Sequence, residues 1–203
     1  MIHESTVIED GAIIGDNVKI GPFCYIKSCV TIEDDCELAS HISLGTSPQS
    51  QEPANPNGRV IIREGTLIKE FVTVNQPCKE KTIVGKNCIL MSISHIAHDC
   101  LVGNNVILTS GSGLSGYCVV GDGTVISGLC HIHQFSKIGR YCMIGSSTFF
   151  KGDSPDGLVW VSNGKVAVPL KVNKNGLDRH NPIDREEVEI KALKFLQEYS
   201  CRV

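Results

Sequence analysis

The chain has 203 residues, of which 41% are hydrophobic and 20% are charged, and its formal net charge is −3. This composition is typical of one sizeable globular domain, and it excludes the strongly basic surface needed for general binding to nucleic acid or to an anionic membrane. No apolar run approaches the ~20 residues of a membrane span, and the N-terminal segment MIHESTVIED lacks the features of a secretory signal. We therefore expect a cytoplasmic protein without a membrane span.

The dominant pattern is a branched aliphatic residue at every sixth position. These positions are Ile8, Ile14, Ile20, Ile26, Ile32, Leu38 and Leu44, then Ile62, Ile68 and Val74, and then eleven in succession at Val84, Leu90, Ile96, Val102, Leu108, Leu114, Val120, Ile126, Ile132, Ile138 and Ile144. Neither a helix of period 3.6 nor an isolated strand of period two places every sixth residue on one face. Stacked units of a short strand and a tight turn do, with three units in a coil of about 18 residues. The sequence therefore predicts an all-β solenoid, a parallel β-helix of hexapeptide repeats.

The fifth position of the hexad is small or β-branched and holds seven of the ten cysteines. These are Cys24, Cys36, Cys88, Cys100, Cys118, Cys130 and Cys142, whereas Cys29, Cys78 and Cys201 follow no pattern. Because no C-x-x-C pair occurs, the cysteines indicate neither a disulfide scaffold nor a metal site. We expect buried thiols that act as small hydrophobes, although oxidation of the stacked pair Cys100 and Cys118 stays open in principle.

Two segments interrupt the repeat. The polar stretch at 45–59, with three prolines and two glycines, is predicted to be a loop ejected from the prism. Leu44 and Ile62 differ by 18, so the coil phase should survive this excursion. The second interruption is QPCKEKT at 76–82. Long loops in a compact scaffold often carry function, so both are of interest.

The repeat ends near Phe150, which divides the chain into a β-helix domain at 1–150 and a connector with a short helical tail at 151–203. The segment IDREEVEIKALKFLQEYS is predicted to be helical, with Asp184 as N-cap and Glu187 three residues on. Its apolar stripe consists of Val188, Ala192, Leu193 and Leu196. We expect this helix to cover an exposed coil end or to pack on a neighbouring subunit.

Chemically active side chains fall into neighbouring columns when residue n lies over residue n+18. His98 then lies over Gly116 and Gln134, while His95 shares a column with His131. Glycine leaves a shallow recess and exposes its backbone N–H, so a polar cluster around it is a plausible acyl-transfer site. A single histidine on a solenoid face is more often a solvated or core-bonded residue, and for His131 both interpretations stay open.

The segments SHIAHDC, SGYCVVGDGTVISGLCHIHQF and VNKNGLDRH resemble one family over about residues 1–185. It is the bacterial acyl-(acyl carrier protein)–UDP-N-acetylglucosamine O-acyltransferase family of lipid A biosynthesis. The resemblance implies a left-handed parallel β-helix and a homotrimer with active sites between subunits. It also implies the first step of that pathway, in which a 3-hydroxyacyl group moves from an acyl carrier protein thioester to the sugar 3-hydroxyl. No bound cofactor or metal is implied.

The resemblance also assigns roles to individual residues. His98 would be the general base, which suits an imidazole at neutral pH. Asp99 would orient or polarise that imidazole, and the backbone N–H of Gly116 would stabilise the oxyanion, an effect often worth ~3 kcal/mol. The residues matching sugar-nucleotide contacts are His95, His133 and Gln134, together with Asn173 and Arg179 for the uridine and phosphate.

Three departures from the family pattern leave the donor and acceptor open. Tyr117 follows the oxyanion glycine where the family usually has histidine. The loop that normally carries an acid and a lysine contains Ser50 and Glu52, and the helical tail is shorter than usual. An acyl-CoA-dependent O- or N-acyltransferase, for example one using acetyl-CoA, is therefore the first alternative.

Two further alternatives belong to other classes of protein. Zinc enzymes on this kind of prism use three histidines, and the spacing of His95 and His131 resembles their first two ligands. The third ligand would fall at Ser136, which leaves too few protein ligands for a catalytic zinc. A non-catalytic scaffold would need none of the polar columns.

Overall fold

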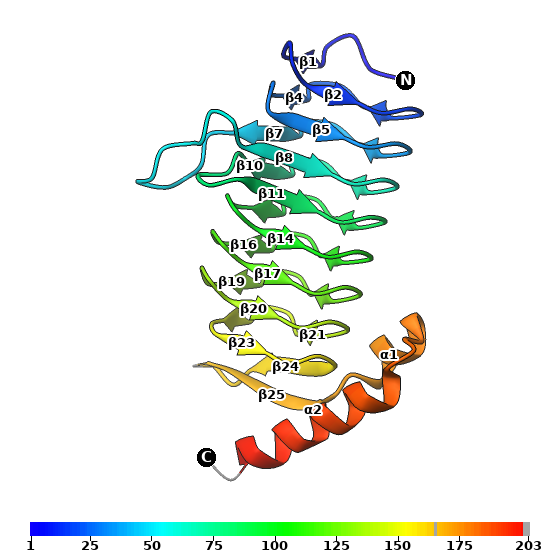
Figure 1. Cartoon of the computed structure of the whole chain (residues 1–203), viewed down its shortest axis with the longest axis vertical. Helices are drawn as coiled ribbons and strands as arrows, with labels where there is room; N and C mark the ends of the chain where they lie inside the picture. Colours follow the sequence, from blue (N-terminus) through cyan, green and yellow to red (C-terminus); the bar gives the residue numbers. More distant parts are fainter. Residues whose placement is uncertain (165, 201–203) are drawn as a thin grey trace.

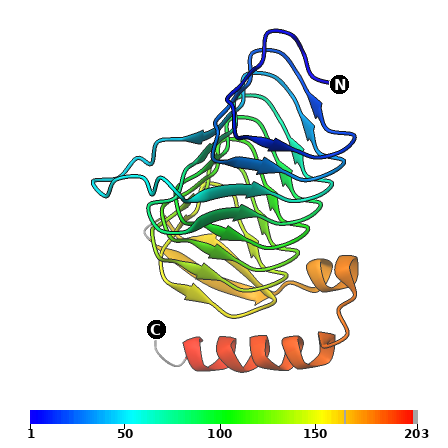
Figure 2. The ribbon, with the colours of Figure 1, turned by 45° about the horizontal axis from the view of Figure 1, so that its top comes forward.

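The computed structural model describes residues 1–164 and 166–200. The chain winds into a three-sided prism in which each strand pairs in parallel with the strand of the next coil (Figure 1). Sheets of eight, eight and nine strands form the three sides. The coils stack from the N-terminal end toward two helices at the other end (Figure 2). The predicted parallel β-helix is confirmed.

Each strand is short, and each sheet takes every third strand of the chain. Sheet 1 contains β1 (Val7–Ile8), β4 (Tyr25–Ile26), β7 (Ser43–Thr46), β10 (Thr73–Asn75), β13 (His95–Ile96), β16 (Gly113–Leu114), β19 (His131–Ile132) and β22 (Phe149–Phe150). Sheet 2 contains β2 (Ile13–Ile14), β5 (Val30–Ile32), β8 (Arg59–Ile62), β11 (Lys81–Val84), β14 (Leu101–Val102), β17 (Val119–Val120), β20 (Lys137–Ile138) and β23 (Asp153–Ser154). Sheet 3 contains β3 (Lys19–Ile20), β6 (Glu37–Leu38), β9 (Leu67–Ile68), β12 (Ile89–Leu90), β15 (Ile107–Leu108), β18 (Val125–Ile126), β21 (Met143–Ile144), β24 (Leu158–Ser162) and the antiparallel β25 (Ala167–Val172).

The aliphatic column fills the interior of the prism. Ile26, Ile62 and Ile96 have no exposed surface, and burial of one such side chain contributes about 1.5–3 kcal/mol. The seven cysteines of the fifth hexad position are buried and free, as predicted. Cys201 lies outside the described residues. The core therefore consists of stacked aliphatic and thiol side chains rather than of disulfides.

The ejected loop changes the register of one coil. Ile62 pairs with Ile32, 30 residues earlier, and lies on β8, whereas Leu44 lies on β7 of the neighbouring sheet. The six-residue phase survives, but the expectation that the coil phase would survive is wrong, because Leu44 and Ile62, 18 residues apart, lie on different sheets and do not stack. The loop itself spans 47–58, because β7 extends to Thr46 and β8 begins at Arg59.

Most corners of the prism use left-handed backbone at the third residue after the inward aliphatic. Asp99, Tyr117 and Phe135 have φ of 59°, 63° and 64°. Such a conformation costs a residue other than glycine about 1–2 kcal/mol, so the packing of each coil on its neighbours must hold it. This corner geometry decides where the side chain of Asp99 goes.

The solenoid continues past its expected end at Phe150. β23 and β24 pair with β20 and β21, and Trp160 extends the interior beyond Phe150, with ring centroids 5.1 Å apart. β25 then turns back against β24. Two helices follow, α1 (Lys174–His180), which lies inside the predicted connector, and α2 (Arg185–Ser200). Neither helix is long and apolar enough to cross a bilayer, judged on the described residues.

Helix α2 covers the C-terminal coil end, one of the two expected placements. Val188 and Ala192 are buried, as the predicted stripe requires, and a side chain on Gly157 would meet Val188. Leu193, which was assigned to the stripe, is 52% exposed. Phe195 takes its place and lies 6.1 Å from the ring of Trp160.

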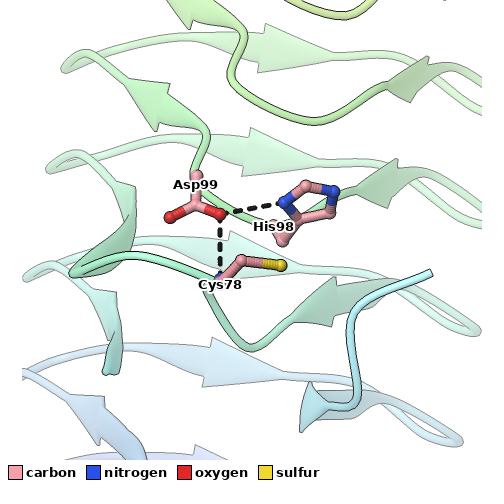
Figure 3. Close-up of side chains that lie close together, drawn as sticks. All are labelled: Cys78, His98 and Asp99. Carbon is pink, nitrogen blue, oxygen red and sulfur yellow. Dashed lines mark hydrogen bonds and ion pairs between the residues drawn. The ribbon is translucent and has the colours of Figure 1, made fainter. Parts of the chain in front are cut away.

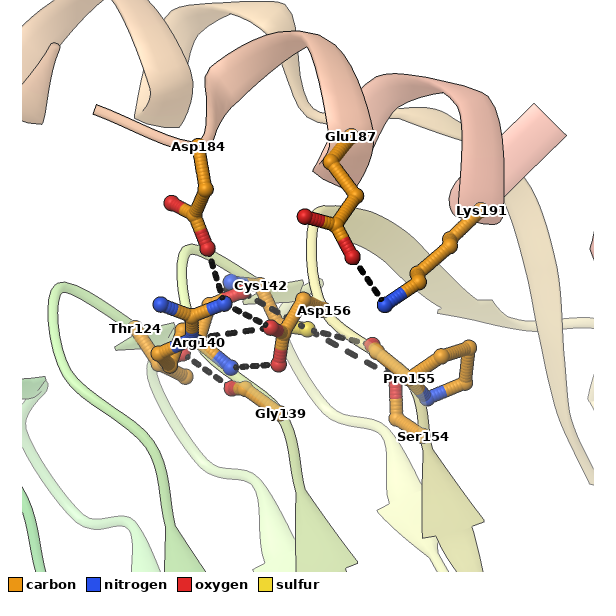
Figure 4. A network of polar contacts seen from close by, with 10 residues as sticks. All are labelled: Thr124, Gly139, Arg140, Cys142, Ser154, Pro155, Asp156, Asp184, Glu187 and Lys191. Carbon is orange, nitrogen blue, oxygen red and sulfur yellow. Dashed lines mark hydrogen bonds and ion pairs between the residues drawn. The ribbon is translucent and has the colours of Figure 1, made fainter. Parts of the chain in front are cut away.

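Arg140 fastens the start of α2 to the prism (Figure 4). Its guanidinium donates to Asp156 Oδ2 at 2.8 Å and to Asp184 Oδ2 at 2.7 Å. Asp184 precedes the helix as predicted, and its carbonyl accepts the Val188 N–H. Its carboxylate, however, is paired with Arg140, which lowers the pKa of Asp184.

Candidate active site

His98 and Asp99 occupy one corner of the prism, between β13 and β14 (Figure 3). Both are buried, and the His98 Nδ1 atom lies 2.9 Å from Asp99 Oδ2. Adjacent side chains on an extended strand point in opposite directions. The left-handed backbone of Asp99 turns its carboxylate back toward the preceding imidazole, and this is why sequence neighbours form a pair.

Backbone donors hold the Asp99 carboxylate in place. The Cys78 N–H donates to Oδ2 and the Lys79 N–H donates to Oδ1, each at 2.9 Å, while the Asp99 N–H donates to Thr82 Oγ1. An ionised carboxylate only accepts hydrogen bonds, so Nδ1 of His98 must carry the hydrogen in this contact. The neutral imidazole therefore has its free lone pair on Nε2.

Gly116 provides the space into which this imidazole projects. A Cβ on Gly116 would lie 2.6 Å from both Nε2 and Cε1 of His98. Within the described part of the chain, the Gly116 N–H donates to no backbone or side-chain acceptor. A basic nitrogen and a free amide donor thus border one bare α-carbon, which is the pairing that acyl transfer needs.

The two chain interruptions meet beside this corner. The Tyr117 hydroxyl and Lys79 Nζ both bond to Glu52 Oε2 at 2.8 Å. These two contacts, led by Lys79, lower the pKa of Glu52, whereas burial and then Glu52 raise the pKa of Tyr117. The Tyr117 ring meets the imidazole of His98 edge-on at 5.1 Å. The acid comes from the ejected loop, but the lysine comes from the second interruption.

A family model described as "Bacterial transferase hexapeptide (six repeats)" matches residues 11–41 and 81–116. The acyl-(acyl-carrier-protein)–UDP-N-acetylglucosamine O-acyltransferase of Sulfurovum sp. (strain NBC37-1) is 36% identical over 95% of this chain and 80% of its own length. The enzyme of the same name from Campylobacter lari is 40% identical, over 96% of this chain and 81% of its own.

A solved structure agrees with these relatives. The UDP-N-acetylglucosamine acyltransferase from Campylobacter jejuni has a TM-score of 0.74 and 32% identity, covering 96% of this chain and 83% of that one. The chain belongs to the acyl-(acyl-carrier-protein)–UDP-N-acetylglucosamine O-acyltransferase family. It is an acyltransferase, and its fold is the left-handed parallel β-helix that the resemblance implied, followed by a short C-terminal helical tail.

Two further histidines of this acyltransferase, His95 and His131, lie on the outer face of sheet 1. His95 pairs with Gly113 and Gly113 with His131, which confirms the predicted column. His95 Nδ1 lies 2.7 Å from Thr73 Oγ1, and burial lowers the pKa of His95, with smaller effects of the charges on His131 and His98. His133 is half-buried, and its Nδ1 lies 3.1 Å from the carbonyl oxygen of Gln134.

The zinc alternative finds no third ligand where it was expected. His131 Nε2 lies 3.2 Å from Ser115 Oγ, away from the Thr73 contact of His95. Ser136 is buried inside the prism, and its hydroxyl accepts the Gly152 N–H. The spacing of His95 and His131 thus reflects the coil register alone.

Asn173 and Arg179 of this acyltransferase lie at a different corner from His98. Asn173 is buried, donates to the carbonyl of Tyr141 at 2.8 Å and accepts the Gly176 N–H that caps α1. Tyr141 lies between β20 and β21, and α1 is on the side of the molecule opposite the ejected loop (Figure 1). One chain therefore does not bring Asn173 or Arg179 to His98.

Proposed function

We propose that this acyltransferase moves a 3-hydroxyacyl group from an acyl carrier protein thioester to the 3-hydroxyl of UDP-N-acetylglucosamine, the first step of lipid A biosynthesis. The relatives whose names carry these two substrates match most of the chain. The observation that carries the proposal is the buried His98–Asp99 pair with its imidazole against Gly116. A sugar hydroxyl is a poor nucleophile until a base accepts its proton, and the free lone pair on His98 Nε2 is such a base.

In this mechanism His98 first accepts the proton of the sugar hydroxyl and then returns it to the leaving group. His98 Nε2 removes the proton from the sugar 3-hydroxyl as the oxygen attacks the thioester carbonyl carbon. Asp99 stabilises the imidazolium through the Nδ1–H, and the Gly116 N–H donates to the oxyanion. Collapse of the tetrahedral intermediate breaks the C–S bond, and the leaving thiolate takes the proton from His98. The products are the acylated sugar nucleotide and the carrier protein thiol.

Sugar-nucleotide contacts are proposed for residues around this corner. His95 lies on β13 in the same coil as His98, and His133 and Gln134 follow β19 two coils farther on, beside the outer face of sheet 1. Lys79, held by Glu52, adds a cation beside Asp99, which suits a substrate with a negatively charged diphosphate. Cofactors are not needed for any step of this transfer.

A homotrimer is part of the proposal. Asn173 and Arg179 sit at another corner of the prism, so they reach the uridine and phosphate only if a second copy presents its α1. Large apolar side chains on the corner before sheet 1, Phe23, Phe71, Ile93 and Leu129, are 54–70% exposed and fit burial between copies. The nine described cysteines are free, which fits a reducing compartment such as the cytoplasm.

A donor panel tests the function directly. Purified protein is incubated with UDP-N-acetylglucosamine and either 3-hydroxyacyl carrier proteins of several lengths or acyl-CoA thioesters, and products are identified by mass spectrometry. We expect an O-acylated product from carrier-protein donors, and a loss of about 10²–10⁴-fold in rate for His98→Ala but not for the exposed-site control His3→Ala. Preference for acetyl-CoA, or an amide product, would replace the proposal with the acyl-CoA alternative.

A further inference from the structure

A thiol lies next to the proposed catalytic pair. The Cys78 Sγ atom, an imidazole nitrogen of His98 and a carboxylate oxygen of Asp99 all lie within 4.8 Å of one another (Figure 3). Among the described residues, this is the one group of three or more histidine, cysteine or acidic side chains with that spacing. No step of the proposed acyl transfer uses the thiol, and Cys78 follows no pattern in the repeat.

We propose that Cys78, His98 and Asp99 bind a divalent transition-metal ion, best matched by zinc, and that this ion switches off acyl transfer. Zinc takes thiolate, imidazole and carboxylate donors at about 2.0–2.3 Å, so donor atoms in a tetrahedral site lie about 3.4–3.6 Å apart. The His98 and Asp99 donors are at least this close, with Nδ1 and Oδ2 2.9 Å apart. A rotation of the Cys78 side chain that moves Sγ by about 1 Å brings all three donor atoms to this spacing.

The chemistry of the donors selects the metal. A thiolate and an imidazole favour zinc and its neighbours over magnesium or calcium, which take oxygen ligands. On binding, the S–H proton of Cys78 leaves to solvent, and the resulting thiolate together with the Asp99 carboxylate balances the charge of the ion. The thiol is available for this change, because among the described residues it donates only to the Glu52 carbonyl, at a long 3.5 Å.

The surroundings hold two of the three ligands ready. The Lys79 N–H bonds to Asp99 Oδ1 and holds the carboxylate in place, with Oδ2 already facing His98 and Cys78. Packing against Gly116 and Tyr117 limits the rotation of the His98 imidazole. Three protein ligands leave a fourth position for water, as in open zinc sites.

Inhibition follows from the imidazole, and this part rests on the proposed role of His98 as base. If the metal binds Nε2, the lone pair that would accept the sugar proton is occupied. If it binds Nδ1, the ring hydrogen moves to Nε2, which then has no lone pair to offer. Metal binding at either nitrogen leaves the enzyme without a base, so the rate of acyl transfer should fall as the metal site fills.

Binding is measured first, because it does not depend on activity. Cobalt is added to the metal-free protein, and thiolate-to-cobalt charge-transfer absorption is recorded; zinc affinity is then measured by competition with a chromophoric chelator. We expect one ion per chain in the wild type. Cys78→Ser should lose the charge-transfer absorption and at least about tenfold in zinc affinity, since loss of even an outer partner of a metal ligand costs that much. Cys29→Ser, which is on the same edge of the prism but three coils before His98, and His3→Gln, near the N-terminus, serve as thiol and imidazole controls and should match the wild type.

Inhibition is measured second, with each variant compared with its own metal-free rate. Zinc should inhibit the wild type over the same concentration range in which it binds, and Cys78→Ser should need at least about ten times more zinc. Equal zinc affinity in the wild type and in Cys78→Ser, or a cobalt spectrum without thiolate absorption, would overturn the site. Zinc that binds without inhibiting would overturn the switch. A wild type with no metal-free transferase activity would instead count against the proposed function, while the binding data would still decide the metal site.

Discussion

The imidazole of His98 fills the space that a side chain at residue 116 would need. A Cβ there would come within 2.6 Å of Nε2 and Cε1, far inside the ~3.5–4.0 Å of an ordinary carbon contact. The backbone of Gly116 is not in the left-handed region, so the imidazole rather than the backbone excludes larger residues.

Gly116→Ala should therefore displace the base without unfolding the coil. We expect the rate of acyl transfer to fall by about 10²-fold, because a shift of about 1 Å in a catalytic group has that effect. Gly128→Ala is a matched control, since this glycine has the same hexad position and its Cβ would meet nothing nearer than Ser110 O at 3.5 Å. Equal rates in the two variants, measured with the same donor, would contradict this account of Gly116.

Asp99→Asn tests how the tautomer of His98 is fixed. The amide has one acceptor oxygen for three donors, the N–H groups of Cys78 and Lys79 and the Nδ1–H of His98. We expect kcat to fall by about 10²-fold with little change in KM for the sugar nucleotide, since the base is misoriented while the binding surface remains. A selective rise in KM would show instead that Asp99 binds substrate.

His95 should make the protein less stable in mild acid. Burial lowers the pKa of His95 in the folded chain, so the unfolded chain binds more protons once the pH falls below the ordinary histidine pKa of about 6.5. Stability is fully present above that pH and declines below it. Thermal midpoints measured from pH 7.5 to 5.5 should fall less steeply for His95→Gln than for the wild type. A slope in His95→Gln equal to that of the wild type would refute the effect.

Arg140 should control the docking of the C-terminal helices. Its removal in Arg140→Ala leaves Asp156 and Asp184 without their shared cation, so we expect faster proteolysis in the 181–185 segment between α1 and α2. The surface pair Lys191–Glu187 lies within α2 and does not contact the prism through its charges. Lys191→Ala should accordingly be cleaved at the wild-type rate, and an equal rate in Arg140→Ala would rule out the anchoring role.

The fold was predictable because a single period controls most of the chain. The coils before Phe150 repeat the same inward aliphatic, so an 18-residue register places His98 over Gly116 without knowledge of any loop. The fold is no longer predictable from the sequence beyond the last residue of the six-residue aliphatic period. The coil that contains Trp160, strand β25 and helix α1 lacks the repeated aliphatic, and the helix stripe shifts from Leu193 to Phe195 because Trp160 is its partner.

For the candidate site, the sequence predicted only which residues stack on one another at a spacing of 18. The contact between Asp99 and His98 depends on the left-handed backbone at Asp99, which the pattern of side chains in the sequence does not predict. The contacts of Cys78 and Lys79 with Asp99 were missed, because the course of the 76–82 segment cannot be read from the repeat. The charged sequence QPCKEKT was the only signal that pointed to them. Asn173 matched a substrate-binding position, yet its side chain caps α1 within its own chain, and its contact with substrate stays a prediction.

A crystal structure with UDP-N-acetylglucosamine tests the central claim most directly. The measured quantity is the distance from His98 Nε2 to the sugar 3-hydroxyl oxygen. We predict a distance of about 2.6–3.2 Å, with the diphosphate near Arg179 of a second copy. A sugar nucleotide bound in good density with no hydroxyl within reach of His98 would contradict the assignment of this histidine as the base.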